Sequence, residues 1–549
     1  MEQIEFNLLE EPWIRVMKKD CTIEECSLTQ ALLNSHEYLR LSGELPTQDV
    51  AILRLLLAVL HTVFYRVDTD GQETPIEDEK QALGRWCDLW QAKRLPQKPI
   101  CEYLEQWKDR FWLFHPEHPF YQVPAAERGT EYTAAKLNGE LSESSNKIRL
   151  FPIRAGKGKE RLGYAEAARW LIYSNGFDDT SAKPKTKGLP SPGAGWLGKL
   201  GLIWAQGDNL FETLMLNLVF LDVGREIWNE PKPVWEREKP KDGERTEIAM
   251  PDNQAELLTL QSRRLLLERD GNTVVGYRLL GGDFFSKIDA IAEQMTMWDR
   301  RQGKKNEPPY DQPKRLNPDR KMWRDFSMIT GKGEEHRAPG VVNWNATLQS
   351  GHALDRNRII RFRVAGVQYG DKDFFVEDVL SDHLDFHTEL LEDAGKLWIG
   401  TIQDQIEKTE RAAWLLGKLA ERIFKAEGGQ PDGNAQAARS HQAAQDYYAA
   451  VDLPFREWLC SVDPQMGDDE DQRRDKQRQW SSEACRIALK QGQEMVRNAG
   501  SAAYVGRWIV NKKTEKAELY SSCAAFNQLK REIYKCFDNP IVKKEAVDE

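Results

Sequence analysis

The sequence predicts an α+β protein, in which a large mixed α/β domain over residues 1–385 precedes a C-terminal four-helix bundle over residues 386–549. Before residue 385, short apolar runs alternate with helical periods and with loops rich in proline and charge. After it, apolar residues recur every three or four positions through long segments. Glycine and proline break this period near 428–433 and 464–467, which is typical of antiparallel helices joined by short connections.

The individual elements follow from the spacing of the apolar residues. In the mixed domain, we expect a strand with a turn at 6–17, a buried helix at 47–67, a helix at 206–223, exposed loops at 229–251 and 300–320, and strands at 274–280 and 359–367. In the bundle, we expect helices at 386–426, 432–462, 468–500 and 512–537.

The composition is that of a globular protein of the cytoplasm. Of 549 residues, 40% are hydrophobic and 30% charged, and 87 acidic against 77 basic side chains give a formal net charge of −10. The longest apolar run, at 50–64, is interrupted by Arg54 and His61 and is too short to span a membrane. The N-terminus lacks the pattern of a signal peptide. None of the eight cysteines forms a Cys-x-x-Cys pair, so we expect reduced thiols and no structural metal.

The basic residues are segregated despite the acidic total. Four runs, at 147–161, 183–199, 300–324 and 356–363, are rich in lysine and arginine, with glycine, proline and aromatic residues between them. Any single run of this kind is more often a solvated surface. Four runs in one region favour contact with phosphates.

None of the motifs that could belong to a catalytic centre has the flanking residues that such a site requires. Residues 193–198 match G-x-G-x-x-G, but a lysine- and proline-rich stretch precedes them and Leu200 occupies the place of a magnesium-binding hydroxyl, which favours a flexible glycine-rich loop. Prolines disrupt the His115/His118 pair, and the His383/His387 pair, with helical spacing, is better explained as a solvated helix start. We therefore expect no catalytic residues, no cofactor and no metal.

Several blocks of sequence resemble one known family. The opening residues 6–16 (FNLLEEPWIRV) resemble the start of CasA, the large subunit of the type I-E CRISPR Cascade complex. Three blocks that follow in the same order are also similar, at 111–122 (FWLFHPEHPFYQ), 195–201 (GWLGKLG) and 209–217 (NLFETLMLN). The predicted C-terminal bundle matches the architecture of this family.

The resemblance implies a non-catalytic role in RNA-guided antiviral defence. Guide RNA reads the target by base pairing, while the large subunit reads the short protospacer-adjacent motif in double-stranded DNA and helps to open the helix for R-loop formation. The implied partners are CRISPR RNA, target DNA, the backbone, small and handle-binding subunits of Cascade, and a helicase-nuclease that the complex recruits. Two alternatives remain open: an architectural subunit that does not read DNA, and a metal-dependent nuclease that uses His383 and His387.

The resemblance also implies a docking loop that meets the RNA handle and a neighbouring subunit. The residues that match it are Asn146, Leu150, Phe151, Lys157 and Lys159. The aromatic ring would wedge against a base or a subunit, and the two lysines would meet phosphates.

Three further elements are implied to read DNA from the minor-groove side. Lys187 and Gly188 match a glycine loop, and Lys287 matches a lysine finger. At the wedge, where the family tends to carry Asn-Gln, this chain has Lys372 with Asp371 beside it, or, with a shift of one residue, Gly370 and Asp371. An acidic residue beside DNA is unfavourable unless Lys372 or a base amino group pairs with it. We therefore expect a different adjacent-motif preference.

Overall fold

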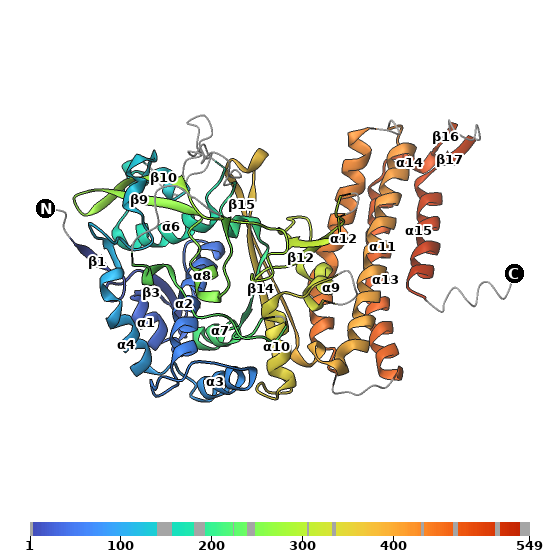
Figure 1. Cartoon of the computed structure of the whole chain (residues 1–549). Coiled ribbons are helices and arrows are strands. Elements are labelled where there is room, and N and C mark those ends of the chain that lie inside the picture. Colours follow the sequence, from blue (N-terminus) through green and yellow to red (C-terminus); the bar gives the residue numbers. More distant parts are fainter. Residues whose placement is uncertain are drawn as a thin grey trace. The chain divides into compact units, whose positions relative to one another are not determined.

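The computed structural model describes residues 4–139, 156–180, 193–222, 224–238, 248–304, 307–331, 336–429, 433–464, 470–510 and 517–538. It divides into two compact units (Figure 1). The first comprises Met1–Met322, Met328–Asp355 and Ile360–His383, and the second comprises Trp323–Ser327, Arg356–Ile359 and Leu384–Glu549. The α+β class is confirmed, since helices and strands mix in the first unit and long helices dominate the second.

The strands that precede the long helices form small sheets. They are β1 (Glu5–Asn7), β2 (Ile14–Lys18), β3 (Ile23–Cys26), β4 (Tyr38–Leu41), β5 (Trp112–Phe114), β6 (Thr130–Thr133), β7 (Leu202–Gln206), β8 (Ile248–Ala249), β9 (Arg263–Asp270), β10 (Thr273–Gly281), β11 (Phe284–Phe285), β12 (Trp298–Arg301), β13 (Tyr310–Pro313), β14 (Ile359–Tyr369) and β15 (Val376–His387). Within the described residues, the three-stranded sheets have the orders β3-β2-β4, β6-β10-β9 and β15-β14-β7. The expected strands at 6–17, 274–280 and 359–367 are thus confirmed.

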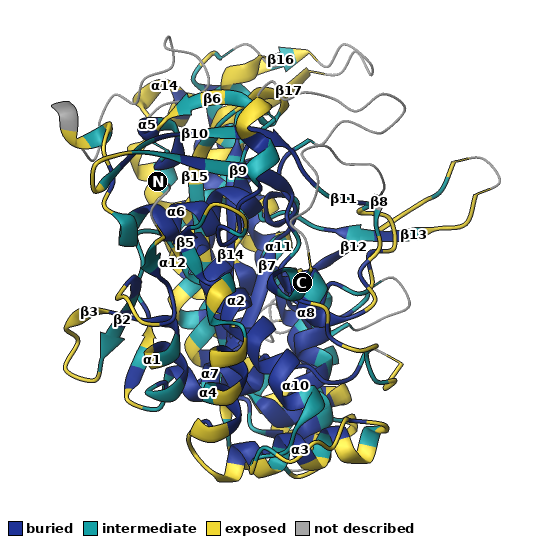
Figure 2. Ribbon diagram, turned by 60° about the vertical axis from the view of Figure 1, so that its left-hand side comes forward, coloured by how far each residue is buried: buried dark blue, intermediate teal, exposed yellow. Residues whose placement is uncertain are grey.

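Helices fill the space around these sheets. Those that precede the long helices are α1 (Leu28–Leu33), α2 (Pro46–Arg66), α3 (Glu79–Gln91), α4 (Gln97–Gln106), α5 (Ala134–Leu137), α6 (Tyr164–Phe177), α7 (Leu210–Leu216), α8 (Gln254–Leu258), α9 (Phe326–Thr330) and α10 (Gly340–Ser350). Buried residues, dark blue in Figure 2, are concentrated around α7, β7 and β14.

The central helix of the first unit is α2, which confirms the helix expected at 47–67. Pro46 begins it, where a missing N–H costs nothing, and Val67 ends it in an extended conformation. It packs against α4, α6, α7 and α8. Among the described helices, α2 alone has the length and hydropathy of a membrane span, but 94% of that stretch is buried within the chain, as in a core helix.

The helix expected at 206–223 is much shorter, because α7 ends at Leu216. The side-chain amide of Asn217 donates to the carbonyl oxygens of Ala205 and Thr213, each at 2.6 Å, and so turns the chain back onto β7. Leu218 and the residues up to Leu221 stay buried without helical structure. The apolar residues after Asn217 therefore reflect burial of an irregular segment and not a longer helix.

The loop expected at 300–320 is wrong in part, because β12 and β13 form an antiparallel hairpin whose second strand lies inside that range. In the stretch at 229–251, the described residues include β8, which pairs in parallel with β11. The proline and charged residues in these two stretches are typical of loops, and they therefore hid the strands β13 and β8 from sequence-based prediction.

Four long helices dominate the described part of the second unit and lie alongside one another in Figure 1. They are α11 (Lys396–Ala426), α12 (Asn434–Cys460), α13 (Glu470–Asn498) and α15 (Ser522–Cys536), and α11 packs against the other three. The first starts ten residues later than expected, because β15 and two 3-10 turns occupy the chain up to Gly395. A short α14 (Ser501–Val505) and a hairpin of β16 (Arg507–Val510) and β17 (Ala517–Tyr520) precede α15.

Candidate nucleic-acid interface

The turn at 193–199 is a buried support rather than the flexible loop that we expected. The N–H of Gly195 donates to the Asp178 carbonyl at 2.9 Å, and that of Trp196 donates to the Ser262 hydroxyl at 3.0 Å. A 3-10 helix of three residues follows, Leu197–Lys199, rather than an α-helix. Because these amides are already bonded, they do not form a phosphate cradle. We call residues 193–199 the support turn.

A buried charge network holds the support turn in the core. The Glu293 carboxylate accepts two hydrogen bonds from Arg54 of α2, at 2.8 and 3.0 Å, and one from the indole nitrogen of Trp196 at 2.8 Å. Its fourth donor is the Met295 N–H, at 3.0 Å. The side chains of Arg54 and Glu293 are almost completely buried, so the network is rigid and costly to break.

The connection between β14 and β15 carries the wedge candidates Asp371 and Lys372, and both are exposed. We call residues 370–375 the hairpin tip. Lys372 has φ of +55° and Asp373 has φ of +61°, a left-handed conformation that non-glycine residues adopt rarely. Two bonds from Thr180 hold this strained backbone: its hydroxyl donates to the Lys372 carbonyl at 2.7 Å, and its N–H donates to the Asp373 carbonyl at 2.9 Å.

Below the hairpin tip, Arg315 makes a bidentate ion pair with Asp373, at 2.8 and 2.9 Å. Burial opposes the charge of Arg315, but the bonds and the charge of Asp373 outweigh it and raise the pKa of the guanidinium. The guanidinium also lies 5.2 Å from the ring centroid of Tyr369. The Tyr369 hydroxyl in turn donates to the Phe177 carbonyl at 2.6 Å and lies against Gly198 of the support turn, where a Cβ would approach it to 2.0 Å.

Sequence reasoning missed three contributors to the hairpin tip, namely Thr180, Arg315 and Phe374. Phe374 is 38% exposed, which is unusual for a phenylalanine and leaves an apolar ring partly exposed two residues after Lys372. The pair of phenylalanines directly after Asp-Lys-Asp was the available signal for this ring.

Arg263 holds both ends of the segment that carries the glycine-loop candidates. Its Nε donates to the Asp178 carboxylate at 2.5 Å. One terminal nitrogen, Nη2, donates to the carbonyls of Asp178, Asp179 and Gly193, at 3.1, 2.9 and 2.7 Å. Asp178 and Asp179 precede the segment 181–192 and Gly193 follows it.

Two candidates, Lys187 and Gly188, lie outside the described residues. Among the residues that border their segment, Thr180 contacts the hairpin tip and Gly193 belongs to the support turn.

The lysine-finger candidate Lys287 is exposed and follows β11 by two residues. Phe285 of β11 packs on Trp196 with ring centroids 4.4 Å apart. The ammonium of Lys199 lies 4.9 Å from the ring centroid of Phe284. The strand β11, which precedes Lys287, and Tyr369, which precedes the hairpin tip, thus both pack on the support turn. The structure brings these segments together from distant parts of the chain.

The docking-loop candidates are described only at their C-terminal end. Asn146, Leu150 and Phe151 lie outside the described residues, and of Lys157 only the backbone is described, in a 3-10 helix at Gly156–Lys159. Lys159 is half-buried, and its carbonyl accepts from the Asn138 amide at 3.4 Å.

The basic run at 300–324 is less available to phosphates than its composition indicates. Asp311 accepts from Arg300 at 3.2 Å and from Arg337 at 2.8 Å. Arg301 pairs with Asp299 at 2.6 Å.

The histidine pairs do not form metal sites in the described residues. The Nδ1 of His115 accepts the N–H groups of Glu117 and His118, so it closes a local turn. His383 and His387 lie on β15 rather than on a helix start, which corrects our expectation. Residues four apart on a strand are separated by about 13 Å. Among the described residues, no group of three or more histidine, cysteine, aspartate or glutamate side chains could hold a metal ion.

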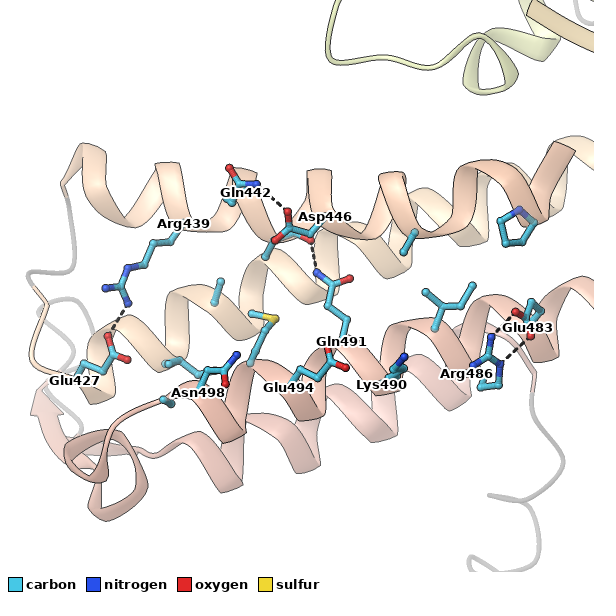
Figure 3. Close-up of a pocket in the computed structure, with 18 residues that line it drawn as sticks. Glu427, Arg439, Gln442, Asp446, Glu483, Arg486, Lys490, Gln491, Glu494 and Asn498 are labelled. Atoms are coloured by element: carbon cyan, nitrogen blue, oxygen red, sulfur yellow. Dashed lines mark hydrogen bonds and ion pairs between the residues drawn. The ribbon is translucent and has the colours of Figure 1, made fainter.

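The second unit contains a groove of about 770 Å³, lined by α11, α12 and α13 (Figure 3). Its charges are largely satisfied within the wall: Arg439 points toward Glu427 at 2.5 Å, and Arg486 pairs with Glu483 on the same helix. The Gln442 amide donates to Asp446 at 2.8 Å. This balance of charge makes the groove a poor site for a polyanion.

Comparison with known proteins places the chain among CRISPR-associated proteins. The family model described as CRISPR-associated protein Cse1 matches residues 7–491. The protein CasA/Cse1 of Thermus thermophilus is 29% identical over 481 residues, which are 83% of this chain and 88% of that protein.

The same relationship holds for solved structures. The crystal structure of Cse1 from Thermobifida fusca superposes with a TM-score of 0.80 at 30% identity and covers 97% of this chain and 98% of that chain. A chain in a structure of a CRISPR RNA-guided surveillance complex shares the fold, with a TM-score of 0.67, 16% identity, and coverage of 96% of this chain and 99% of that chain.

Proposed function

The chain belongs to the CRISPR-associated protein Cse1 family, the large subunits of type I-E Cascade, and from this we propose that it recognises the protospacer-adjacent motif in double-stranded target DNA. In this role it starts the unwinding that leads to an R-loop and supports recruitment of the helicase-nuclease. It acts without catalysis of its own, in the cytoplasm, with CRISPR RNA and the other Cascade subunits as partners.

The hairpin tip is the observation that carries this proposal. It combines an exposed cation, Lys372, with an exposed aromatic ring, Phe374, on a backbone fixed from below. Minor-groove proteins insert apolar side chains between base steps to unstack them, while cations meet phosphates or groove edges. Preorganisation matters, because a flexible tip would lose in ordering entropy what it gains from the contact.

The carboxylate of Asp371 indicates which base pair the hairpin tip would prefer. In the minor groove, only the guanine N2 amino group offers a hydrogen-bond donor to a carboxylate, whereas A·T pairs present acceptors alone. We therefore expect the preferred motif to contain a G·C pair where Asp371 reaches the groove.

The test is binding of the reconstituted RNA-guided complex to duplexes with a randomised short motif beside the guide-matched segment, with and without this chain. We expect the chain to select particular motifs and Lys287→Ala to blunt that selection. Lys19→Ala, which removes an exposed lysine of the β2–β3 turn, is the matched control and should leave selection unchanged. Binding that is indifferent to the motif, or to the chain, would reject the reading role.

Two other functions give different results in the same preparation. A purely architectural subunit would restore assembly of the complex while Lys287→Ala and Lys19→Ala behaved alike. A nuclease would cleave DNA with added metal and lose that activity in His387→Ala; the position of His383 and His387 on one strand disfavours this alternative.

A further inference from the structure

A second surface with the chemistry of a nucleic-acid site lies on the helical unit, far along the chain from the elements above. Along α11, Arg411, Trp414, Lys418, Arg422 and Lys425 recur at intervals of three or four residues and so share one face of the helix. We call these five residues, with the facing side of α15, the α11/α15 face. Trp414 is 48% exposed, although a tryptophan side chain is ordinarily mostly buried.

Two cations of the same helix lie close to the exposed ring. The Arg411 guanidinium lies 4.0 Å from the centroid of the Trp414 ring, and the Lys418 ammonium lies 5.4 Å from it. One turn further on, Arg422 and Lys425 lie 5.6 and 5.3 Å from the ring centroid of Tyr520. The face therefore alternates aromatic rings and positive charge.

A cleft of about 260 Å³ opens beside the ring, between α11 and α15. Trp414, Leu415 and Leu419 line it from α11, and Ala525 and Leu529 line it from α15. The cleft combines an apolar floor with a cationic rim, as a planar base attached to a phosphate chain requires.

Four of the five α11 residues that define this face are lysine or arginine, although the whole chain is acidic. Among the described residues, the neighbouring carboxylates include Glu407, one turn before Arg411, and Glu532 at the cleft. Glu421 pairs with Lys418 at 2.9 Å, and Glu518 pairs with Arg422 at 3.3 Å. Both ion pairs are partly exposed, where such pairs are weak, so phosphates can replace the carboxylates at little cost.

We propose that the α11/α15 face binds single-stranded nucleic acid, with a base stacked on Trp414 at the cleft and phosphates on Arg411, Lys418 and Arg422. Positions four apart on the helix, such as 418 and 422, are separated by about 6 Å, so successive cations can follow successive phosphates. A duplex would keep its bases stacked inside and could not use the ring. An acidic protein would use the cations alone, so the exposed ring favours nucleic acid.

The test measures binding of the full-length chain to a fluorescein-labelled oligo-dT strand by anisotropy, over a range of salt concentrations. We expect Trp414→Ala to weaken binding roughly ten-fold, the usual effect of losing one stacked base, and Trp414→Phe to retain most of the affinity. Arg411→Glu with Arg422→Glu should weaken binding further and flatten its salt dependence. These side chains are at the surface, and thermal melting followed by circular dichroism checks that each variant is folded.

Two matched controls separate this site from the others. Lys490→Glu reverses an exposed cation on the α13 wall of the groove and should change oligo-dT affinity less than two-fold. Lys19→Ala, at the exposed β2–β3 turn, should also leave it unchanged. Because this assay measures affinity of the free chain for a single strand and not motif selection by the complex, this proposal and the motif-reading role can fail independently. The proposal is overturned by equal affinity of Trp414→Ala and the unaltered chain, by equal weakening in Lys490→Glu, or by competition from polyglutamate as strong as that from unlabelled oligo-dT.

Discussion

Replacement of Arg263 tests whether a buried cation fixes both ends of the segment that carries Lys187 and Gly188. Its side chain is completely buried and that of Asp178 is 6% exposed, so Arg263→Met leaves a buried carboxylate without its partner. Removal of one partner from such a pair costs about 3–5 kcal/mol. The carbonyls of Asp179 and Gly193 lose their donor as well, and we therefore expect a loss near the upper end of that range.

The assay is guanidinium unfolding of the chain, followed by motif selection in the reconstituted complex. Arg278→Met is the matched control, because Arg278 lies on the neighbouring strand β10 and pairs with Glu268, but its side chain is 31% exposed; we expect it to cost about 1 kcal/mol or less. Arg263→Met with Asp178→Asn should recover part of the loss. A loss below about 1 kcal/mol in Arg263→Met, or a loss equal to that of the control, would refute the reasoning.

Three other expectations follow from described contacts. Lys372→Gly should stabilise the chain by about 1 kcal/mol relative to Lys372→Gln, since glycine adopts the left-handed conformation freely; equal unfolding midpoints would contradict the strained tip. Glu293→Gln removes the charge that Arg54 requires and should lower the free energy of unfolding by about 3 kcal/mol. Glu24→Gln, at an exposed pair with Lys18, should lower it by less than about 1 kcal/mol. Thermal unfolding measures both variants, and similar losses would argue against the buried network. Burial lowers the pKa of His61 to about 3, below the value of about 6.5 in the unfolded chain, so its contribution is complete above pH 6.5 and is lost as the pH falls toward 3. The free energy of unfolding should fall by about 2.5 kcal/mol between pH 7 and pH 4.5 through this group. Urea unfolding at the two pH values measures this difference, and His61→Phe should remove it. An unchanged pH dependence in His61→Phe would show that His61 is not buried as a neutral ring.

Apolar periodicity predicted the elements that are buried on a regular face. The helix α2 and the strands β10 and β14 are of this kind, and they appear where the spacing placed them. The same signal overextended α7, because apolar residues continue through a buried irregular segment after Asn217. It also hid the strand character of His383 and His387, whose spacing of four fits a helix.

The candidate site was only partly visible in the sequence, since long-range pairs build its support. Arg315 and Asp373 are 58 positions apart, and Trp196 and Glu293 are 97 apart. No local pattern reports such a pair. The family resemblance marked Lys287, Asp371 and Lys372 as candidates, and all three are exposed. Only the fold shows that the segments carrying them pack on the same support turn.

The most direct test of the central claim compares the motif-selection profile of the reconstituted complex containing Lys372→Ala with that of the complex containing Lys19→Ala. We expect Lys372→Ala to flatten the preference among motifs while guide-matched DNA still binds, and Lys19→Ala to reproduce the unaltered profile. Identical profiles for the two variants would contradict the assignment of the hairpin tip as the reader of the adjacent motif.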